Sequence, residues 1–296
     1  MAFGHRKANV VAVAMAVAGM FALATPASAA SFNLTNGTLS VTIGDNGAID
    51  TLTFTGIDFY NPGTPVSDIG LQVGTNTATF RLNTTTGGVA IPGSSTNPTW
   101  TGTYAPLGGT DNVTKTYSLV SGLNVLQVTT TLTNNTGSAI TIRAFDTFDP
   151  DQGTPVGAGA STFNDIYLLG SGNVMRSTSN AGANSRTVVM GYSPEEAFGG
   201  GSSSFGLGVS NGTELNACFA TPFDPNGAFS DIGICIGAEL TIAAGGSVTW
   251  TYYQAYGLTQ AAAEAAFLAA VPEPTTLLLF GLGLAGAARR LRRRRA

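Results

Sequence analysis

The stretch "LSVTIGDNGAIDTLTF" (residues 39–54) decides the fold class of this chain. Leu39, Val41 and Ile43 alternate with small polar residues, which is the period-two spacing of a half-buried β-strand. The turn sequence "DNG" (45–47) follows, and the run behind it alternates in the same way. Two alternating runs joined by an Asp-Asn-Gly turn predict a β-hairpin.

The same alternation recurs in residues 124–133, 140–144 and 247–257, and the turn "NNTG" (134–137) separates the first two runs. Threonine, valine, isoleucine and aromatic residues dominate these runs, and they suit a pleated surface. The one convincing helix of the body is "TQAAAEAAFLAA" (259–270), whose first residue is a suitable N-cap. We therefore predict an all-β fold, a sandwich or supersandwich of antiparallel strands, with this helix as a spacer.

The N-terminus has the pattern of a secretory signal. Basic residues precede an uncharged apolar run (10–24), and "ASA" (27–29) supplies the small residues of a cleavage site. We predict a helical signal peptide over residues 1–30 that the general secretion machinery uses. The alternative is an N-terminal membrane anchor that the cell retains.

The C-terminus, "VPEPTTLLLFGLGLAGAARRLRRRRA" (271–296), has three parts in a fixed order. Pro272, Glu273 and Pro274 come first. An apolar stretch (275–288) follows, and as a helix it covers about 21 Å against a hydrocarbon core of about 30 Å. We predict a short transmembrane helix, with its positive flank in the cytoplasm and the body therefore exported. The flanking cluster consists of Arg289, Arg290, Arg292, Arg293, Arg294 and Arg295.

This order of parts resembles the PEP-CTERM sorting signal. The resemblance implies recognition by an exosortase, a membrane cysteine protease and transpeptidase, with residues 272–274 as the recognised tripeptide. It also implies an association with exopolysaccharide and biofilm matrix. The expected location is an inner-membrane-anchored precursor that faces the periplasm, and then the cell surface or extracellular matrix. The alternative is a simple tail anchor with a basic stop-transfer flank.

These patterns divide the chain into a signal peptide (1–30), an all-β domain (31–258), a helical spacer (259–270) and a sorting tail (271–296). Between the two ends, residues 31–270 keep five basic and sixteen acidic residues, a net charge of −11. A body with this charge repels phosphate backbones and anionic lipids, so we expect no nucleic-acid partner.

The single histidine of the chain, His5, lies in the predicted signal peptide. The mature body therefore lacks the residue needed for a Ser-His-Asp triad, for imidazole acid–base catalysis and for histidine-ligated metals. From this absence we predict that the chain is not an enzyme.

Two stretches of the body, residues 39–59 and 117–151, are similar to strands of galactose-mutarotase-like supersandwich domains. Such patterns also occur in immunoglobulin-like adhesive domains. Epimerases of the mutarotase-like family use a histidine pair and a glutamate, and the body offers no histidine. The resemblance therefore implies a sugar-binding or structural use of the fold.

Cys218 and Cys235 are the two cysteines, in "NACFA" and "GICIG". In an oxidising compartment a bridge between them would contribute about 3 kcal/mol on the chain-entropy model. We predict a structural disulfide, with two free buried thiols as the alternative.

Asp146, Asp149 and Asp151 lie within "FDTFDPDQG" (145–153), and "PFDPNGAFSD" (222–231) partly repeats this pattern. Carboxylates gathered on a turn suit Ca²⁺, which takes six to eight oxygen ligands. The spacing of a calcium-binding loop is absent, and Asp-Pro is a turn former without any metal. Calcium, a plain turn and catalysis are the three interpretations, and no other cofactor is expected.

Trp100 and Tyr104 lie in a loop-like stretch rich in glycine, proline and threonine, where exposed rings would stack on sugars. A glycosidase would instead need two facing carboxylates, and Asp149, Glu195 and Glu196 are candidates that no spacing selects. The leading prediction is an exported cell-surface or matrix protein with a structural or interaction role. The alternatives are a carbohydrate-binding module and a carbohydrate-active enzyme that uses paired carboxylates.

Overall fold

A computed structural model describes residues 31–44, 47–59, 67–74, 76–79, 89–91, 97–170, 172–192, 199–203, 227 and 229–271. These residues belong to one compact unit, Ser31–Ala296. The predicted signal peptide (1–30) and residues 272–296 of the sorting tail lie outside the described residues. None of the helices in the described part is long and apolar enough to cross a membrane.

The described strands form two sheets in which every pairing is antiparallel. The first sheet has the order β1-β2-β3-β5-β11-β17-β15, with β4 beside β3 and β6 beside β5. Its strands are β1 Phe32–Thr35, β2 Leu39–Ile43, β3 Ile49–Phe54, β4 Ile57–Asp58, β5 Ser67–Val73, β6 Asn76–Thr79, β11 Ile140–Phe148, β15 Gly199–Ser203 and β17 Gly233–Ile242.

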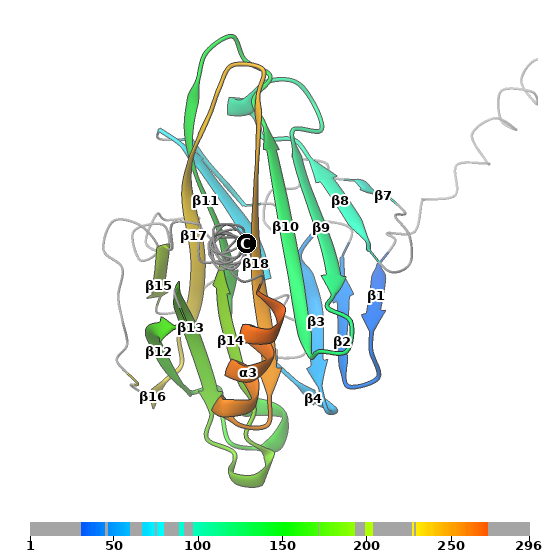
Figure 1. The fold of residues 1–296 in the computed structure, drawn as a ribbon, viewed down its shortest axis with the longest axis vertical. Coiled ribbons are helices and arrows are strands. Elements are labelled where there is room, and N and C mark those ends of the chain that lie inside the picture. The colour runs from blue at the N-terminus through cyan, green and yellow to red at the C-terminus, as the bar shows by residue number, and fades with distance from the viewer. Residues whose placement is uncertain are drawn as a thin grey trace, which may run out of the picture. The chain divides into compact units, whose positions relative to one another are not determined.

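The second sheet has the order β16-β12-β13-β14-β18-β10-β9-β8-β7 (Figure 1). Its strands are β7 Val89–Ile91, β8 Thr99–Gly102, β9 Val113–Leu119, β10 Val125–Thr133, β12 Thr162–Leu169, β13 Gly172–Ser179, β14 Thr187–Tyr192, β16 Phe229–Ser230 and β18 Ser247–Gly257. Three short 3₁₀ turns, Ala105–Leu107, Thr154–Val156 and Gly182–Asn184, lie between strands.

The two sheets bury their facing sides against each other, as in a β-sandwich. The predicted hairpin of residues 39–54 is β2 paired with β3, and Val41 lies opposite Leu52 in the register. In β2, buried residues alternate with half-buried ones, as the period-two pattern predicts. On β10, Leu126, Val128 and Leu132 are buried in the same core. The prediction of an all-β antiparallel sandwich is confirmed.

The turn at residues 134–137 carries the chain from the second sheet (β10) to the first (β11). Asn134 holds this crossover from a fully buried position. Its Nδ2 donates to the carbonyls of Ser138 at 2.8 Å and of Ile242 and Ala243 at 3.1 Å each. Its Oδ1 accepts from the backbone N–H of Thr136 at 3.0 Å. Because Ile242 ends β17, one side chain joins this crossover to the one between β17 and β18.

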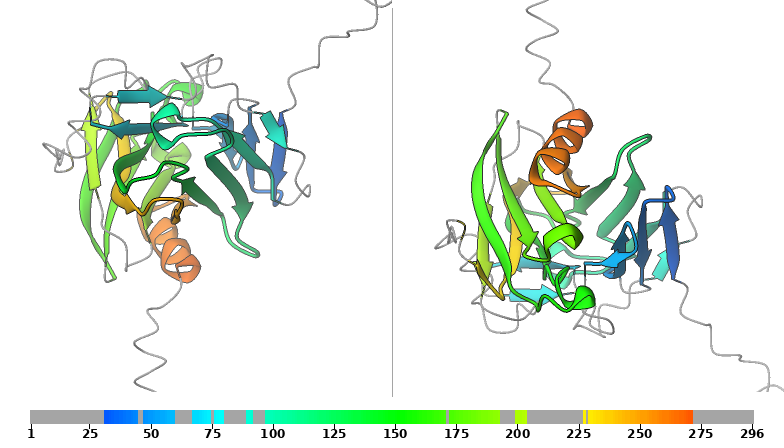
Figure 2. Two further views of the ribbon diagram at one scale, coloured as in Figure 1. Left: turned by 90° about the horizontal axis from the view of Figure 1, so that it is seen from above. Right: turned by 90° about the horizontal axis from the view of Figure 1, so that it is seen from below.

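Helix α3 (Gln260–Ala270) covers the outer face of the second sheet, on β14 and β18 (Figure 2). Thr259 is its N-cap and accepts from the backbone N–H of Ala262 at 3.2 Å. Phe267 is buried against the sheet, and a Cβ added at Gly191 would lie 2.6 Å from its ring. The helix predicted from the sequence is present, and it packs closely because the strand below it has glycine at this point.

Candidate functional site

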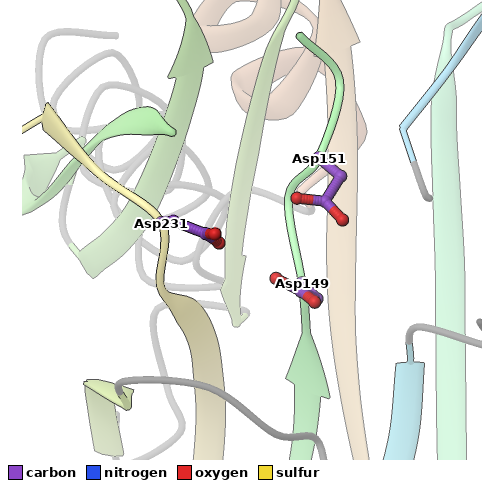
Figure 3. A group of neighbouring side chains, drawn as sticks. All are labelled: Asp149, Asp151 and Asp231. Atoms are coloured by element: carbon purple, nitrogen blue, oxygen red, sulfur yellow. The ribbon is translucent and has the colours of Figure 1, made fainter. Parts of the chain in front are cut away.

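Three carboxylates converge where strands from the two sheets end (Figure 3). Asp149 and Asp151 follow β11 of the first sheet, and Asp231 lies between β16 of the second sheet and β17 of the first. One carboxylate oxygen from each lies within 4.8 Å of the others. The cluster therefore consists of one i, i+2 pair and one residue that is distant in the sequence.

Asp151 is the most buried member, with 6% of its surface exposed. Its Oδ1 has no hydrogen-bond partner among the described residues. Burial, followed by the charges of Asp149 and Asp231, raises the pKa of Asp151 to about 7. The backbone around it is well held, because its N–H donates to the carbonyl of Phe59 at 2.9 Å and its carbonyl accepts from Thr154 at 2.8 Å.

The third aspartate of the predicted calcium cluster, Asp146, lies elsewhere. It projects from β11 into the core, where the Nζ of Lys115 donates to its Oδ1 at 2.6 Å. Both side chains are fully buried. Burial raises the pKa of Asp146 against the opposing effect of the Lys115 ammonium. The structure thus assigns Asp146 to an ion pair between the sheets and brings Asp231 to Asp149 and Asp151 in its place.

In the sequence, the stretch that contains Asp231 is distinguished only as a partial repeat of the pattern around Asp149. That repeat was the available signal, although it gave no reason to place the two stretches side by side. Asp224 and Asn226, the other polar residues of the repeat, lie outside the described residues, as do Glu195 and Glu196, the candidate partners of Asp149 in a glycosidase.

Trp100 and Tyr104 are buried, with 2% and 3% of their surfaces exposed, so the expectation of exposed sugar-stacking rings is wrong for both. The Trp100 ring occupies the space beside Gly47, where an added Cβ would lie 2.5 Å from it. The Tyr104 hydroxyl accepts from the backbone N–H of Val73 at 3.0 Å, and burial raises its pKa to about 12. Both rings therefore belong to the hydrophobic core.

A different aromatic pair is exposed. Phe163 on β12 and Phe229 on β16 lie opposite each other, with ring centroids 4.7 Å apart. Their exposed fractions are 37% and 44%. Phe229 precedes Asp231 by two residues, so this pair lies close in the chain to the carboxylate cluster. No pattern in the sequence distinguishes these rings from the many buried ones.

Cys235 on β17 is disulfide-bonded. The other cysteine of the chain, Cys218, lies outside the described residues. The sorting tripeptide Pro272, Glu273 and Pro274 and the arginine cluster of the tail lie outside them as well.

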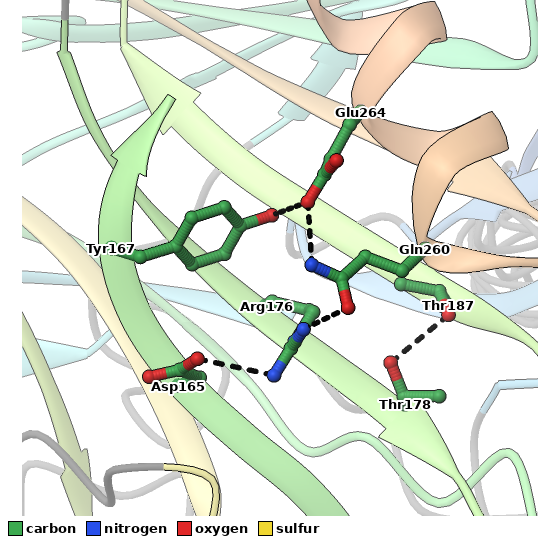
Figure 4. A network of polar contacts seen from close by, with 7 residues as sticks. All are labelled: Asp165, Tyr167, Arg176, Thr178, Thr187, Gln260 and Glu264. Carbon is green, nitrogen blue, oxygen red and sulfur yellow. Dashed lines mark hydrogen bonds and ion pairs between the residues drawn. The ribbon is translucent and has the colours of Figure 1, made fainter. Parts of the chain in front are cut away.

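A polar network attaches helix α3 to the second sheet (Figure 4). The hydroxyl of Tyr167 donates to Glu264 at 2.7 Å, and Gln260 donates to the same carboxylate oxygen at 2.6 Å. Arg176 donates to Gln260 and pairs with Asp165 at 3.1 Å. Burial, together with the hydrogen bond to Glu264, raises the pKa of the Tyr167 phenol above its usual range. Each of these side chains has a partner within the network, which therefore has a structural role.

Residues 270–294 match the model of the PEP-CTERM protein-sorting motif. The resemblance of the tail is confirmed, and the motif implies an exported protein that an exosortase processes and that is sorted to the cell surface. A search of curated proteins found no similar sequence.

Several solved structures are similar to this chain. A bacterial glucoamylase in complex with acarbose is 12% identical with a TM-score of 0.53, and the match covers 81% of this chain and 33% of that one. A polysaccharide lyase is 12% identical with a TM-score of 0.44, over 77% of this chain and 34% of that one. A galactose mutarotase-like protein from Lactobacillus casei ATCC 334 is 9% identical with a TM-score of 0.46, and the match covers 77% of this chain and 100% of that one. This chain thus spans a third of the glucoamylase's length.

The prediction that the chain is not an enzyme is overturned by the likeness to the glucoamylase. The prediction rested on the absence of histidine in the body, whereas a similar fold occurs in part of a glucoamylase. The carboxylate cluster also shows why the inference failed, because glycoside hydrolysis needs two carboxylates and no imidazole. The absence of histidine therefore does not exclude catalysis.

Residues 39–59 and 117–151 resemble strands of galactose-mutarotase-like domains, and the structural neighbours include a protein of that description. The likeness concerns the fold alone at this level of identity. The strand pairing and the match at the C-terminus together identify two parts of the molecule: the chain is an antiparallel β-sandwich protein that carries a PEP-CTERM protein-sorting motif at residues 270–294.

Proposed function

We propose that this protein is displayed at the bacterial surface or in the extracellular matrix, where its sandwich associates with exopolysaccharide. The observation that carries the proposal is the sorting motif behind an exported β-domain. A protein delivered to this location meets matrix polysaccharide at high local concentration. The signal peptide and the inner-membrane-anchored precursor belong to the same proposal.

The exposed pair Phe163 and Phe229 supports a carbohydrate contact. Aromatic faces carry negative charge density and attract the positively polarised C–H groups of a sugar ring. The body has a net charge of −11 over residues 31–270, which repels polyanions. We therefore propose a neutral polysaccharide as the partner.

Affinity electrophoresis of the full chain in detergent tests this proposal, with neutral exopolysaccharide extracted from the producing cells cast into the gel. The wild-type protein is expected to migrate more slowly in the polysaccharide gel than in a plain gel. The variant Phe163→Ala/Phe229→Ala is expected to lose most of this retardation. Leu168→Ala is the matched control, because Leu168 is 68% exposed on the same strand as Phe163. Equal mobility of wild type in both gels would refute the proposal.

A carbohydrate-active enzyme is the second candidate, and the convergence of Asp149 and Asp231 favours it. Carboxyl oxygens within 4.8 Å are nearer to the separation of about 5 Å in retaining glycosidases than to the larger one in inverting enzymes. Release of reducing ends from the same polysaccharide is the assay. Activity that Asp149→Asn or Asp231→Asn abolishes would support the enzyme, and an inactive wild type would argue against it.

A further inference from the structure

We propose that Asp149, Asp151 and Asp231 bind a calcium ion. The three carboxylates lie close enough to share one cation, since one oxygen from each lies within 4.8 Å of the others (Figure 3). The negative charges of neighbouring carboxylates repel one another, and a divalent cation removes that repulsion. The residues come from two separate segments, so the fold itself brings them together.

The state of Asp151 is an independent indication of a ligand. Only 6% of the residue is exposed, yet its buried Oδ1 receives no hydrogen bond from any described residue. A buried carboxylate without a donor is costly unless a cation or water satisfies it. In Figure 3 its carboxylate turns toward the other two members of the cluster.

The same loop carries two more buried oxygens without a hydrogen-bond partner among the described residues, Oε1 of Gln152 and Oγ1 of Thr154. Both atoms can accept, and neither belongs to a carboxylate. A loop of four residues, 151–154, thus holds three buried acceptor oxygens that the described protein leaves unsatisfied.

The types of ligand atom available at the site favour calcium over other metal ions. All available ligands are oxygens, because the body contains no histidine and the described cysteine, Cys235, is in a disulfide. This set does not suit zinc, which prefers nitrogen and sulfur. Magnesium demands near-ideal octahedral geometry, whereas calcium accepts irregular sites of six to eight oxygens. Three carboxylates from two segments, supplemented by water, meet the looser demand.

The position of the site gives the ion a structural consequence. Asp149 and Asp151 leave the first sheet, while Asp231 follows β16, which belongs to the second. A bound ion would therefore connect the two sheets at this end and restrain the segment that carries Phe229. Calcium binding is measured directly, so the test of this inference does not depend on the proposed polysaccharide association.

The test uses the full chain in detergent, stripped with EGTA and then titrated calorimetrically with CaCl₂ alone. We expect one saturable site with a Kd of about 10⁻⁴–10⁻³ M, as in extracellular calcium modules. At about 10 mM calcium the Tm should rise by about 3–10 °C. Titration with MgCl₂ alone should give at least about tenfold weaker binding, and magnesium binding as tight as calcium binding would overturn the assignment.

Asp149→Asn and Asp231→Asn are the diagnostic variants, because both side chains are half-buried and asparagine keeps their shape. Each should weaken calcium binding at least tenfold and lose the rise in Tm, while circular dichroism without calcium matches that of wild type. Glu239→Gln is the matched control: it removes one negative charge from an exposed ion pair on β17 and should bind calcium like wild type.

Two results would overturn the proposal. The first is a wild-type protein without saturable calcium binding, or variants that bind as tightly as wild type. The second is polysaccharide cleavage that EGTA leaves unchanged and Asp149→Asn abolishes, which would assign these carboxylates to acid–base chemistry instead.

Discussion

Lys115 and Asp146 meet between the sheets, on β9 of the second and β11 of the first. Burial alone would lower the pKa of Lys115, but the carboxylate of Asp146 and then the side chain of Tyr117 raise it above its usual range. Each charge is therefore tolerated in the core because the other is present. A buried pair of this kind contributes little net stability compared with apolar side chains of similar volume.

Replacement of one partner should show this dependence. Lys115→Met leaves the buried carboxylate of Asp146 without its ammonium and should lower the free energy of unfolding by about 3–5 kcal/mol. The double variant Lys115→Met/Asp146→Leu should recover most of the loss, because no buried charge is left over. Urea unfolding measures both. A single variant as stable as wild type would contradict this account of the pair.

The role of Asn134 also depends on long-range contacts, because its amide reaches carbonyls more than one hundred positions away. Asn134→Ala leaves these buried carbonyls without their donor and should cost about 2–4 kcal/mol. Asn135→Ala is the control, since the exposed Asn135 amide donates to one carbonyl, that of Gly108. Thermal unfolding compares the two, and equal losses would show that burial of the Asn134 amide is unimportant.

At the scale of elements, helix α3 depends on a small core of its own. Phe267 and Ala263 pack on Val189, Tyr253 and other residues on the outer face of the second sheet. The helix has eleven residues, a length that is marginal in isolation, so its stability comes from this packing.

Phe267→Ala should therefore lower the free energy of unfolding by about 3–5 kcal/mol, the range for a buried aromatic ring. Its neighbour provides the comparison, because Leu268 is 49% exposed and Leu268→Ala should change stability by no more than about 0.5 kcal/mol. Chemical denaturation followed by circular dichroism distinguishes them. If both variants lost the same amount, the helix would not depend on its buried face.

At the scale of the whole molecule, the sorting motif and the sandwich are separate in the chain and separable by experiment. Replacement of Pro272, Glu273 and Pro274 by alanine should leave export intact and stop processing. The intact mass of the membrane fraction should then retain the arginine tail. Alanine at Thr275 and Thr276 is the matched control and should leave processing unchanged. Normal processing of the first variant would contradict the role of the tripeptide.

The sequence predicted well what depends on neighbours in the chain. The alternation in residues 39–54 fixes which side chains of β2 and β3 share a face, because successive residues of a strand point to opposite faces. The capped helix after Thr259 is similarly local. The turn at 134–137 was also recognisable. The sequence did not show that this turn connects the two sheets, since turn residues do not specify which strands pair.

The candidate site was predictable only in part, for the same reason. Asp149 and Asp151 are close in any conformation of a short turn, and the sequence selected them. Asp231 joins them from about eighty residues away because β16 pairs with β12 and β17 with β11. Asp146 looked equivalent to its neighbours, yet the register of β11 turns it into the core.

By itself, therefore, the sequence determined the all-β class, the terminal helix and the sorting motif, all of which are encoded in local order. Tertiary structure alone decided which carboxylates converge, which aromatic rings are exposed and which lysine neutralises Asp146. The physical reason is that strand pairing is non-local: registers between distant segments place each side chain in the core, in the cluster or in solvent.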